Sequence, residues 1–289
     1  MKEGRSDFRI FQHTFFRMNK LTTLFLGTVL SSSMLPGWTA APPKPYGAIP
    51  TPAQIKWQRM EFYGFIHFGL NTFTGREWGY GDEDPKIFNP TDFNASDIVS
   101  TFKKGGMKGM IYTAKHHDGF CAWPTKSTDH NITKSPWKNG KGDVVREFAL
   151  ACKKHGIKFG TYLSPWDRNN ADYGKDGYLD VYYKQIRELL TNYGPVFEIW
   201  FDGANGGDGY YGGAREKRNI GDAEKYYNFE KIVEMIRKIQ PGCIIWGAGH
   251  HGDARWGGSE KGHVNYPHWS TVGLNGGGGG TGMRGGERW

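Results

Sequence analysis

Five short apolar runs recur along the chain, and they constrain its fold more than any other feature of the sequence. The runs are rich in β-branched and aromatic residues, and they show no clean alternation of apolar and polar positions. Strands with this pattern are buried on both faces, as in a parallel sheet. They occupy residues 63–69, 109–120, 157–165, 196–203 and 242–251.

Patterns with helical periodicity separate these runs. Apolar stripes lie at residues 98–102, 145–152, 182–193 and 229–239, and glycine follows each stripe within a few residues. Asp143 is placed to cap the second stripe, and glycine is the usual residue after a helix end. The alternation of strands and helices predicts an α/β fold with right-handed crossovers.

The spacing of these units selects one type of α/β fold. At roughly forty residues a unit, it favours a (β/α)8-like TIM barrel with long loops over a compact doubly wound sheet. No glycine-rich nucleotide motif follows the first strands. After the fifth run we find one possible strand near Arg255, and no helical stripe follows Ile239. We therefore expect an incomplete barrel whose last strands are missing, with exposed sheet edges, poor solubility and weak activity.

The N-terminal part has a different character. Residues 18–40 resemble a secretory signal peptide, with a short basic start, an apolar stretch and small residues near its end. The apolar stretch is too short for a membrane span. Residues 1–17 are interpreted as an upstream extension, 41–52 as a proline-rich linker and 53–289 as the partial barrel. These features predict export to the periplasm or the cell exterior.

The cysteine content and the charge distribution argue against a disulfide-stabilised protein and against a nucleic-acid-binding protein. The chain has three cysteines, and Cys152 and Cys243 fall in apolar positions, so we expect buried thiols and no disulfide framework. The formal net charge of +8 comes from scattered lysines and arginines without a basic block. This distribution does not predict a nucleic-acid partner.

Polar, titratable and aromatic residues stand at every strand end. In a (β/α) barrel the catalytic groups gather at the carboxyl ends of the strands. Asp202 is the clearest case, because it ends a buried aromatic strand and glycines follow it. The residues at the ends, in chain order, are His67, His116, His117, Tyr162, Trp166, Asp202, His250 and His251, with Arg255, Trp256 and Glu260 beyond them.

Each of these residues also has a structural interpretation. Asp202 could cap a helix, His67 could be a buried core histidine, and Glu260 could be a solvated loop residue. Glu77 and Trp78 could belong to an ordinary loop. The pair at 116 and 117 could bind a metal, but neighbours on a strand point to opposite faces, and no zinc-binding motif accompanies them. We therefore predict no metal.

Two carboxylates among many aromatic residues suit glycoside hydrolysis. In that chemistry one carboxylate attacks the anomeric carbon, and a protonated one gives its proton to the leaving oxygen. Aromatic residues make up 15% of the chain and include 11 tryptophans. They could form a large aromatic core, or they could stack on the C–H faces of a sugar.

Six segments carry a resemblance to a known family. They read GFIHFG, EWGYG, TAKHHDGFCAWPT, FGTYLSPWD, EIWFDGANG and RWGGSEKG, and they span about residues 50 to 289. The chain resembles the exported α-L-fucosidases of glycoside hydrolase family 29. The resemblance implies a retaining exo-enzyme that removes terminal α-L-fucose from a fucosylated oligosaccharide or glycoprotein glycan, without metal or organic cofactor.

The resemblance also implies roles for individual residues. Asp202 aligns with the nucleophile, and Glu260 aligns with the acid/base of members that have Asn where this chain has Ser259. The FDGANGGDGYYGG loop resembles the branch that prefers α-1,3/1,4-linked fucose. The family usually continues into a C-terminal β-sandwich, and we expect none within these 289 residues. Residues aligned with positions that hold fucose hydroxyls, or pack on its ring and methyl, are His67, Glu77, Trp78, His116, His117, Tyr162 and Trp200.

Two other functions remain open at this stage. A non-catalytic protein could bind fucosylated glycans in the same pocket, although loss of one carboxylate would then be expected, and both Asp202 and Glu260 are present. A barrel hydrolase of another sugar, such as a galactosidase, would use the same architecture with a different ring in the pocket.

Overall fold

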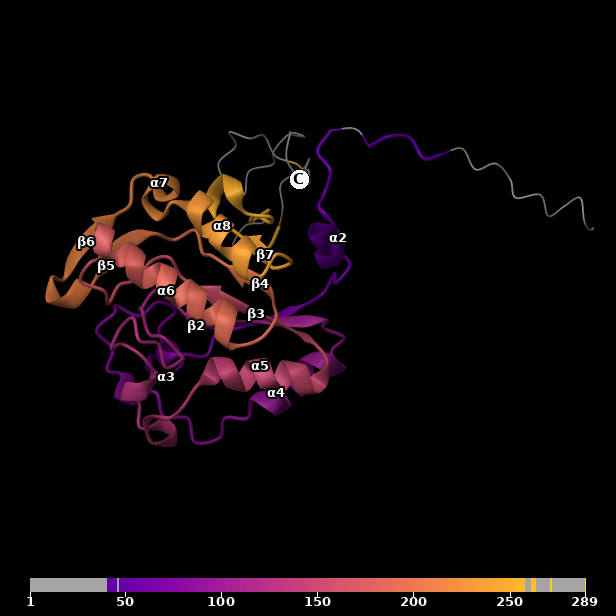
Figure 1. The fold of residues 1–289 in the computed structure, drawn as a ribbon. Helices are drawn as coiled ribbons and strands as arrows, with labels where there is room; N and C mark the ends of the chain where they lie inside the picture. The colour runs from indigo at the N-terminus through magenta and orange to yellow at the C-terminus, as the bar shows by residue number, and fades with distance from the viewer. Residues whose placement is uncertain (1–40, 46, 258–260, 264–270, 272–288) are drawn as a thin grey trace, which may run out of the picture. The chain divides into compact units, whose positions relative to one another are not determined.

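A five-stranded parallel sheet is the main element of the described structure. The computed structural model describes residues 41–45, 47–257, 261–263, 271 and 289 (Figure 1). The chain divides into two compact units, 1–45 and 46–289. In the first, the described residues form no helix or strand. The sheet lies in the second, and its strands are β1 (Gly64–Ile66), β2 (Gly109–Lys115), β3 (Lys158–Leu163), β4 (Val196–Trp200) and β7 (Ile244–Trp246).

All five predicted strands are confirmed, and they pair in the order of the chain. The sheet order is β1-β2-β3-β4-β7, and every pairing is parallel. A doubly wound sheet would instead reverse its order at a switch point. The predicted possible sixth strand does not form in the part of the chain that is described, where Ala254 makes one isolated bridge to Trp246.

Four helices connect the strands, as the stripes predict. They are α4 (Ala95–Lys104), α5 (Val144–His155), α6 (Asp176–Asn192) and α8 (Phe229–Ile239). The Asp143 side chain accepts a hydrogen bond from the backbone N–H of Arg146, and Gly156 ends α5 in the left-handed conformation. Helices α4 and α5 pack against each other, as do α6 and α8 (Figure 1). None of the described helices is long and apolar enough to cross a membrane.

Several short elements were not predicted from the sequence. The glycine-rich stretch after Asp202, expected to be a plain loop, forms an antiparallel hairpin of β5 (Gly206–Gly209) and β6 (Glu216–Asn219). The added α-helices are α2 (Pro52–Gln58), α3 (Leu70–Thr74) and α7 (Ala223–Tyr227). The 3-10 helices are η1 (Pro85–Ile87), η2 (Ile132–Lys134), η3 (Trp137–Gly140), η4 (Tyr211–Gly213) and η5 (Gly249–His251).

The core is strongly aromatic and contains the thiols. Tyr112 on β2 packs on Phe148 of α5, with ring centroids 4.8 Å apart. Cys152 and Cys243 are buried and unpaired, as predicted, and so is Cys121. The aromatic excess therefore serves the core, at least in part.

One carboxyl group is buried inside the sheet. Glu198 on β4 is 0% exposed, and Trp57 Nε1 of α2 donates a hydrogen bond of 2.6 Å to its Oε2. Within the described residues its Oε1 has no hydrogen-bond partner. Burial raises the pKa of Glu198 to about 8, against the opposing effect of hydrogen bonds from Trp57 and Tyr63. The folded protein therefore keeps this carboxyl protonated at neutral pH.

We predict that Glu198→Gln stabilises the protein progressively as the pH rises from 5 to 8. Below a pKa of 4.5 the carboxyl is neutral in both states, but above it the unfolded chain ionises while the folded chain holds its proton until about pH 8. The wild type therefore loses about 1 kcal/mol of unfolding free energy per pH unit in this window. Urea unfolding at pH 5, 6.5 and 8 measures the difference, with the exposed Glu234→Gln as control. A constant difference between wild type and Glu198→Gln would contradict the prediction.

Candidate active site

A cavity of about 1090 Å³ opens at the carboxyl ends of the strands. Its volume lies slightly above the usual range for small-molecule sites. Of the nine residues to which the family resemblance assigns roles, eight line this cavity. The ninth, Glu260, lies outside the described residues. The eight are His67, Glu77, Trp78, His116, His117, Tyr162, Trp200 and Asp202.

Asp202 stands two residues beyond the end of β4, and both of its carboxyl oxygens are held. The Tyr162 hydroxyl donates to Oδ2 at 2.9 Å, and the backbone N–H of Ala204 donates to Oδ1 at 2.8 Å. No helix follows directly, so the carboxylate is not a helix cap. The two hydrogen bonds fix its orientation while the group still lines the cavity.

Three imidazoles line the same cavity as this carboxylate. The ring of His67 is 5.2 Å from that of His116, which is 4.2 Å from that of His117. The expectation that His116 and His117 point to opposite faces was wrong. Strand β2 ends at Lys115, so the alternation of a strand no longer applies to them, and both rings line the same cavity.

Burial keeps these histidines neutral. It lowers the pKa of His116 to about 3, assisted by the neighbouring imidazoles and opposed by Asp202. It also lowers the pKa of His117 to about 3, with a further contribution from the charge of Arg168. The pKa of His67 is lowered by burial and partly restored by Asp202. A neutral imidazole offers one donor and one acceptor, which suits a sugar hydroxyl.

A hydrogen bond fixes the tautomer of His117. Its Nδ1 lies 2.7 Å from the Ser164 hydroxyl, and that hydroxyl donates its proton to the carbonyl of Trp166 at 2.8 Å. Ser164 must then accept from His117, so Nδ1 carries the proton and Nε2 is an acceptor. This acceptor is available to a donor in the cavity.

Aromatic rings form one wall of the cavity. The Trp200 indole stacks between Tyr162, at 5.2 Å, and Trp246, at 3.7 Å. Phe65 contacts the Trp200 ring edge to face at 5.5 Å. Sequence reasoning missed Phe65 and Trp246 as lining residues, although both belong to predicted strands. Their positions could be found by aligning the strand ends with Trp200.

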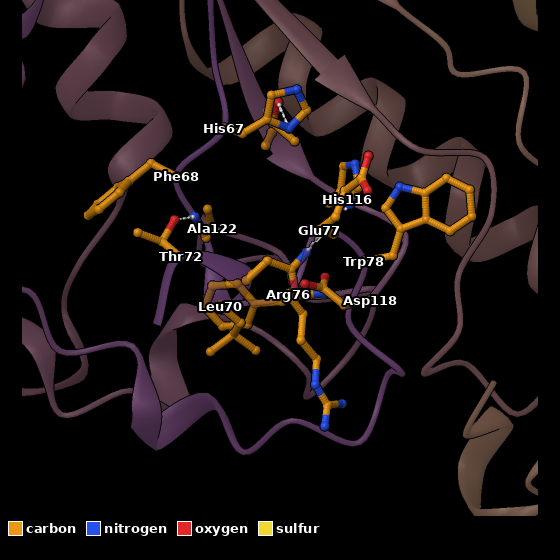
Figure 2. A pocket seen from close by; sticks show the side chains of 15 residues that line it. His67, Phe68, Leu70, Thr72, Arg76, Glu77, Trp78, His116, Asp118 and Ala122 are labelled. Atoms are coloured by element: carbon orange, nitrogen blue, oxygen red, sulfur yellow. Dashed lines mark hydrogen bonds between the residues drawn. The ribbon is translucent and has the colours of Figure 1, made fainter. Parts of the chain in front are cut away.

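A second cavity of about 370 Å³ adjoins the first and shares His67, Glu77, Trp78 and His116 with it. Figure 2 shows Phe68 on the side opposite Trp78, and the Arg76 guanidinium extending away from the cavity. Asp118 lines it at 2% exposure, and burial raises the pKa of this carboxyl to about 7. The sequence signal for Asp118 was its place directly after the histidine pair.

The histidines at the fifth strand end lie elsewhere. His250 and His251 belong to η5, and their Nε2 atoms lie 3.5 and 3.1 Å from the Glu224 carboxylate of α7. They line a separate hollow and do not line the large cavity, so the expectation that every strand end contributes to one site was wrong for this pair. Among the described residues, no cluster of three or more His, Cys, Asp or Glu is arranged to hold a metal.

Comparisons with known proteins identify the family of this chain. The family model for alpha-L-fucosidase matches residues 46–268. The chain belongs to the alpha-L-fucosidase family. It is 42% identical over 260 residues to Alpha-L-fucosidase 1 of Arabidopsis thaliana, covering 88% of this chain and 48% of that protein. The chain thus spans about half the length of this relative.

Solved structures of the family share the fold. A member of glycoside hydrolase family 29 from an unknown rumen bacterium is 51% identical, with a TM-score of 0.82 over 85% of this chain and 45% of that one. A Ruminococcus gnavus fucosidase of the same family, solved in complex with fucose, is 31% identical, with a TM-score of 0.71 over 87% of this chain and 56% of that one.

We predict that His116→Asn and His117→Asn each reduce the loss of stability on acidification. Between pH 6.5 and about 3 these imidazoles become protonated in the unfolded chain but stay neutral in the folded protein. The wild type therefore loses about 1 kcal/mol per pH unit for each group as the pH falls. Urea unfolding at pH 4, 5 and 7 measures the slopes, with His155→Asn on α5 as control. Parallel slopes for wild type and both variants would refute neutral burial.

Proposed function

We propose that this chain carries the catalytic site of an exo-α-L-fucosidase, which hydrolyses terminal α-linked L-fucose on a fucosylated oligosaccharide or glycoprotein glycan. The observation that carries the proposal is the Asp202 carboxylate, held by Tyr162 and facing the cavity beside three imidazoles. The five parallel strands are proposed to form part of a TIM barrel, the fold family in which strand ends carry the chemistry.

The proposed reaction is a double displacement with retention. The Asp202 carboxylate attacks the anomeric carbon, while an acid gives its proton to the departing glycosidic oxygen. We assign that acid to Glu260. The resulting fucosyl ester of Asp202 is then cleaved by water, whose proton returns to Glu260, and the Asp202 carboxylate leaves.

The neutral imidazoles and the aromatic wall would recognise the sugar. His67, His116 and His117 offer hydrogen bonds to neighbouring hydroxyls, because an uncharged ring can both donate and accept. Phe65 and Trp200 provide apolar surface for the ring and the methyl group. Glu77 and Trp78 reach the cavity from the loop after α3. We further propose α-1,3/1,4-linked fucose as the preferred substrate, and export of the protein from the cytoplasm.

We expect Asp202→Ala to lower the release of fucose from 4-nitrophenyl α-L-fucoside by on the order of 10³-fold or more, because the variant lacks the carboxylate that is proposed to form the ester. L-fucose should still bind, as titration calorimetry would show. Asp180→Ala, on the outer helix α6, is the control. Wild-type release by Asp202→Ala would end the assignment, whereas binding without any release by the wild type would favour a glycan-binding protein.

Specificity for the methyl group gives an independent test. L-galactoside carries a hydroxyl where fucose has hydrogen on C6, and an unpaired hydroxyl against aromatic rings costs about 1–3 kcal/mol. We therefore expect kcat/KM for 4-nitrophenyl α-L-galactoside to be about tenfold or more below that for the fucoside. Equal values would contradict an apolar methyl site.

A further inference from the structure

We propose that Arg168 is a positioning residue, which fastens the loop of residues 76–83 to the β5–β6 hairpin and so holds Glu77 and Trp78 over the sugar site. We call residues 76–83 the rim loop. The inference rests on the proposed function, since it assigns Glu77 and Trp78 to the sugar site. Arg168 itself does not line the cavity, so it acts through the residues that it holds.

Three consecutive carbonyl groups of the rim loop are taken by groups outside it. Arg168 Nη1 donates to the carbonyl of Gly79 at 2.7 Å. The backbone N–H of Tyr210 donates to Tyr80 at 3.0 Å, and Asn169 Nδ2 donates to Gly81 at 2.8 Å. The backbone of the loop is therefore held by the segment after β3 and by the hairpin connection.

The same guanidinium binds the hairpin. Arg168 Nε donates to the carbonyl of Asp208 on β5 at 2.6 Å. The backbone carbonyl of Arg168 accepts from Tyr211 at 2.8 Å, and its backbone N–H donates to His117 at 2.8 Å. Arg168 therefore joins the rim loop, the β5–β6 hairpin and the backbone at His117.

Ring contacts connect Arg168 with residues that line the cavity. The guanidinium lies over the rings of Trp166 and Tyr80, 4.9 and 5.2 Å from their centroids. The Trp166 ring is 5.7 Å from that of Trp78 and 5.2 Å from that of His117. The position of Trp78, which is 46% exposed, therefore depends on the stack that Arg168 completes.

The fit between the two backbones is close. Gly81 has φ of +96°, and a Cβ atom there would lie 2.4 Å from the carbonyl carbon of Arg168. Only glycine allows this approach. Within the loop, Glu83 accepts hydrogen bonds from the N–H groups of Tyr80 and Gly81. These internal bonds shape the turn but do not attach it to the rest of the site.

Limited trypsin digestion tests the fastening without any ligand. The Arg76 side chain is 61% exposed, and cleavage after it cuts the rim loop. We expect Arg168→Ala to accelerate this cleavage several-fold, measured by mass spectrometry at pH 7.5. Asn169→Ala should do so less, and Arg168→Lys should fall between wild type and Arg168→Ala. Arg187→Ala on α6 is the matched control and should cleave like the wild type.

Binding of L-fucose and kinetics with 4-nitrophenyl α-L-fucoside test the consequence for the site. We expect the Kd and KM of Arg168→Ala to rise roughly tenfold, because a displaced wall weakens substrate placement. We expect kcat to fall less. Arg168→Lys should recover part of the loss, and Asn169→Ala, which leaves the guanidinium in place, should show a smaller rise.

The outcomes separate the two proposals. If the wild type neither binds nor releases fucose, the proposed function is wrong, while the digestion still decides whether Arg168 fastens the loop. If Arg168→Ala and Asn169→Ala both cleave at the wild-type rate, the fastening is refuted. If the loop loosens but Kd and KM stay at wild-type values, Arg168 has no positioning role. Should Arg168→Ala fail to fold, Asn169→Ala and Arg168→Lys decide each point.

Discussion

The register of the parallel sheet is the constraint on which the site depends. Tyr162 on β3 pairs with Trp200 on β4, and Trp200 pairs with Trp246 on β7. Backbone pairing therefore places three aromatic residues side by side, and their rings stack into one wall. Asp202 follows Trp200 by two residues, so the same register brings it to the Tyr162 hydroxyl. A shift of one residue would turn these side chains to the other face.

Burial of polar groups beside this wall has to be compensated. Lys115, the last residue of β2, is 0% exposed, and its ammonium contacts Asp167 at 3.2 Å, Tyr178 at 3.0 Å and Gln185 at 2.9 Å. All three protons of the ammonium therefore have partners, which a buried charge requires. The histidines that follow have no such set of partners, and the protein keeps them neutral instead. These two histidines therefore add no positive charge to the cavity.

The loops after the strands do more than connect elements. The hairpin formed by β5 and β6, the segment after β3 and the rim loop meet at Arg168, whose guanidinium donates to one carbonyl of the hairpin and one of the rim loop. The two strands of the hairpin itself pair through backbone groups. Backbone bonds depend little on side-chain identity. For this reason the glycine-rich stretch after Asp202 indicated only a loop in the sequence. In the structure it forms the β5–β6 hairpin, which accepts a hydrogen bond from Arg168.

The sequence by itself determined the five strands, the four long helices and the candidate residues at the strand ends, because the hydrophobic pattern and its period are properties of neighbouring residues. Asp202 and Tyr162 could be named in advance for this reason. Only the tertiary structure decided that His116 and His117 share a cavity, that His250 and His251 pair with Glu224 instead, and that Arg168 joins three loops. These facts rest on contacts between residues far apart in the chain. Such contacts cannot be predicted from the pattern of neighbouring residues, because each depends on the path that the backbone takes after the turns.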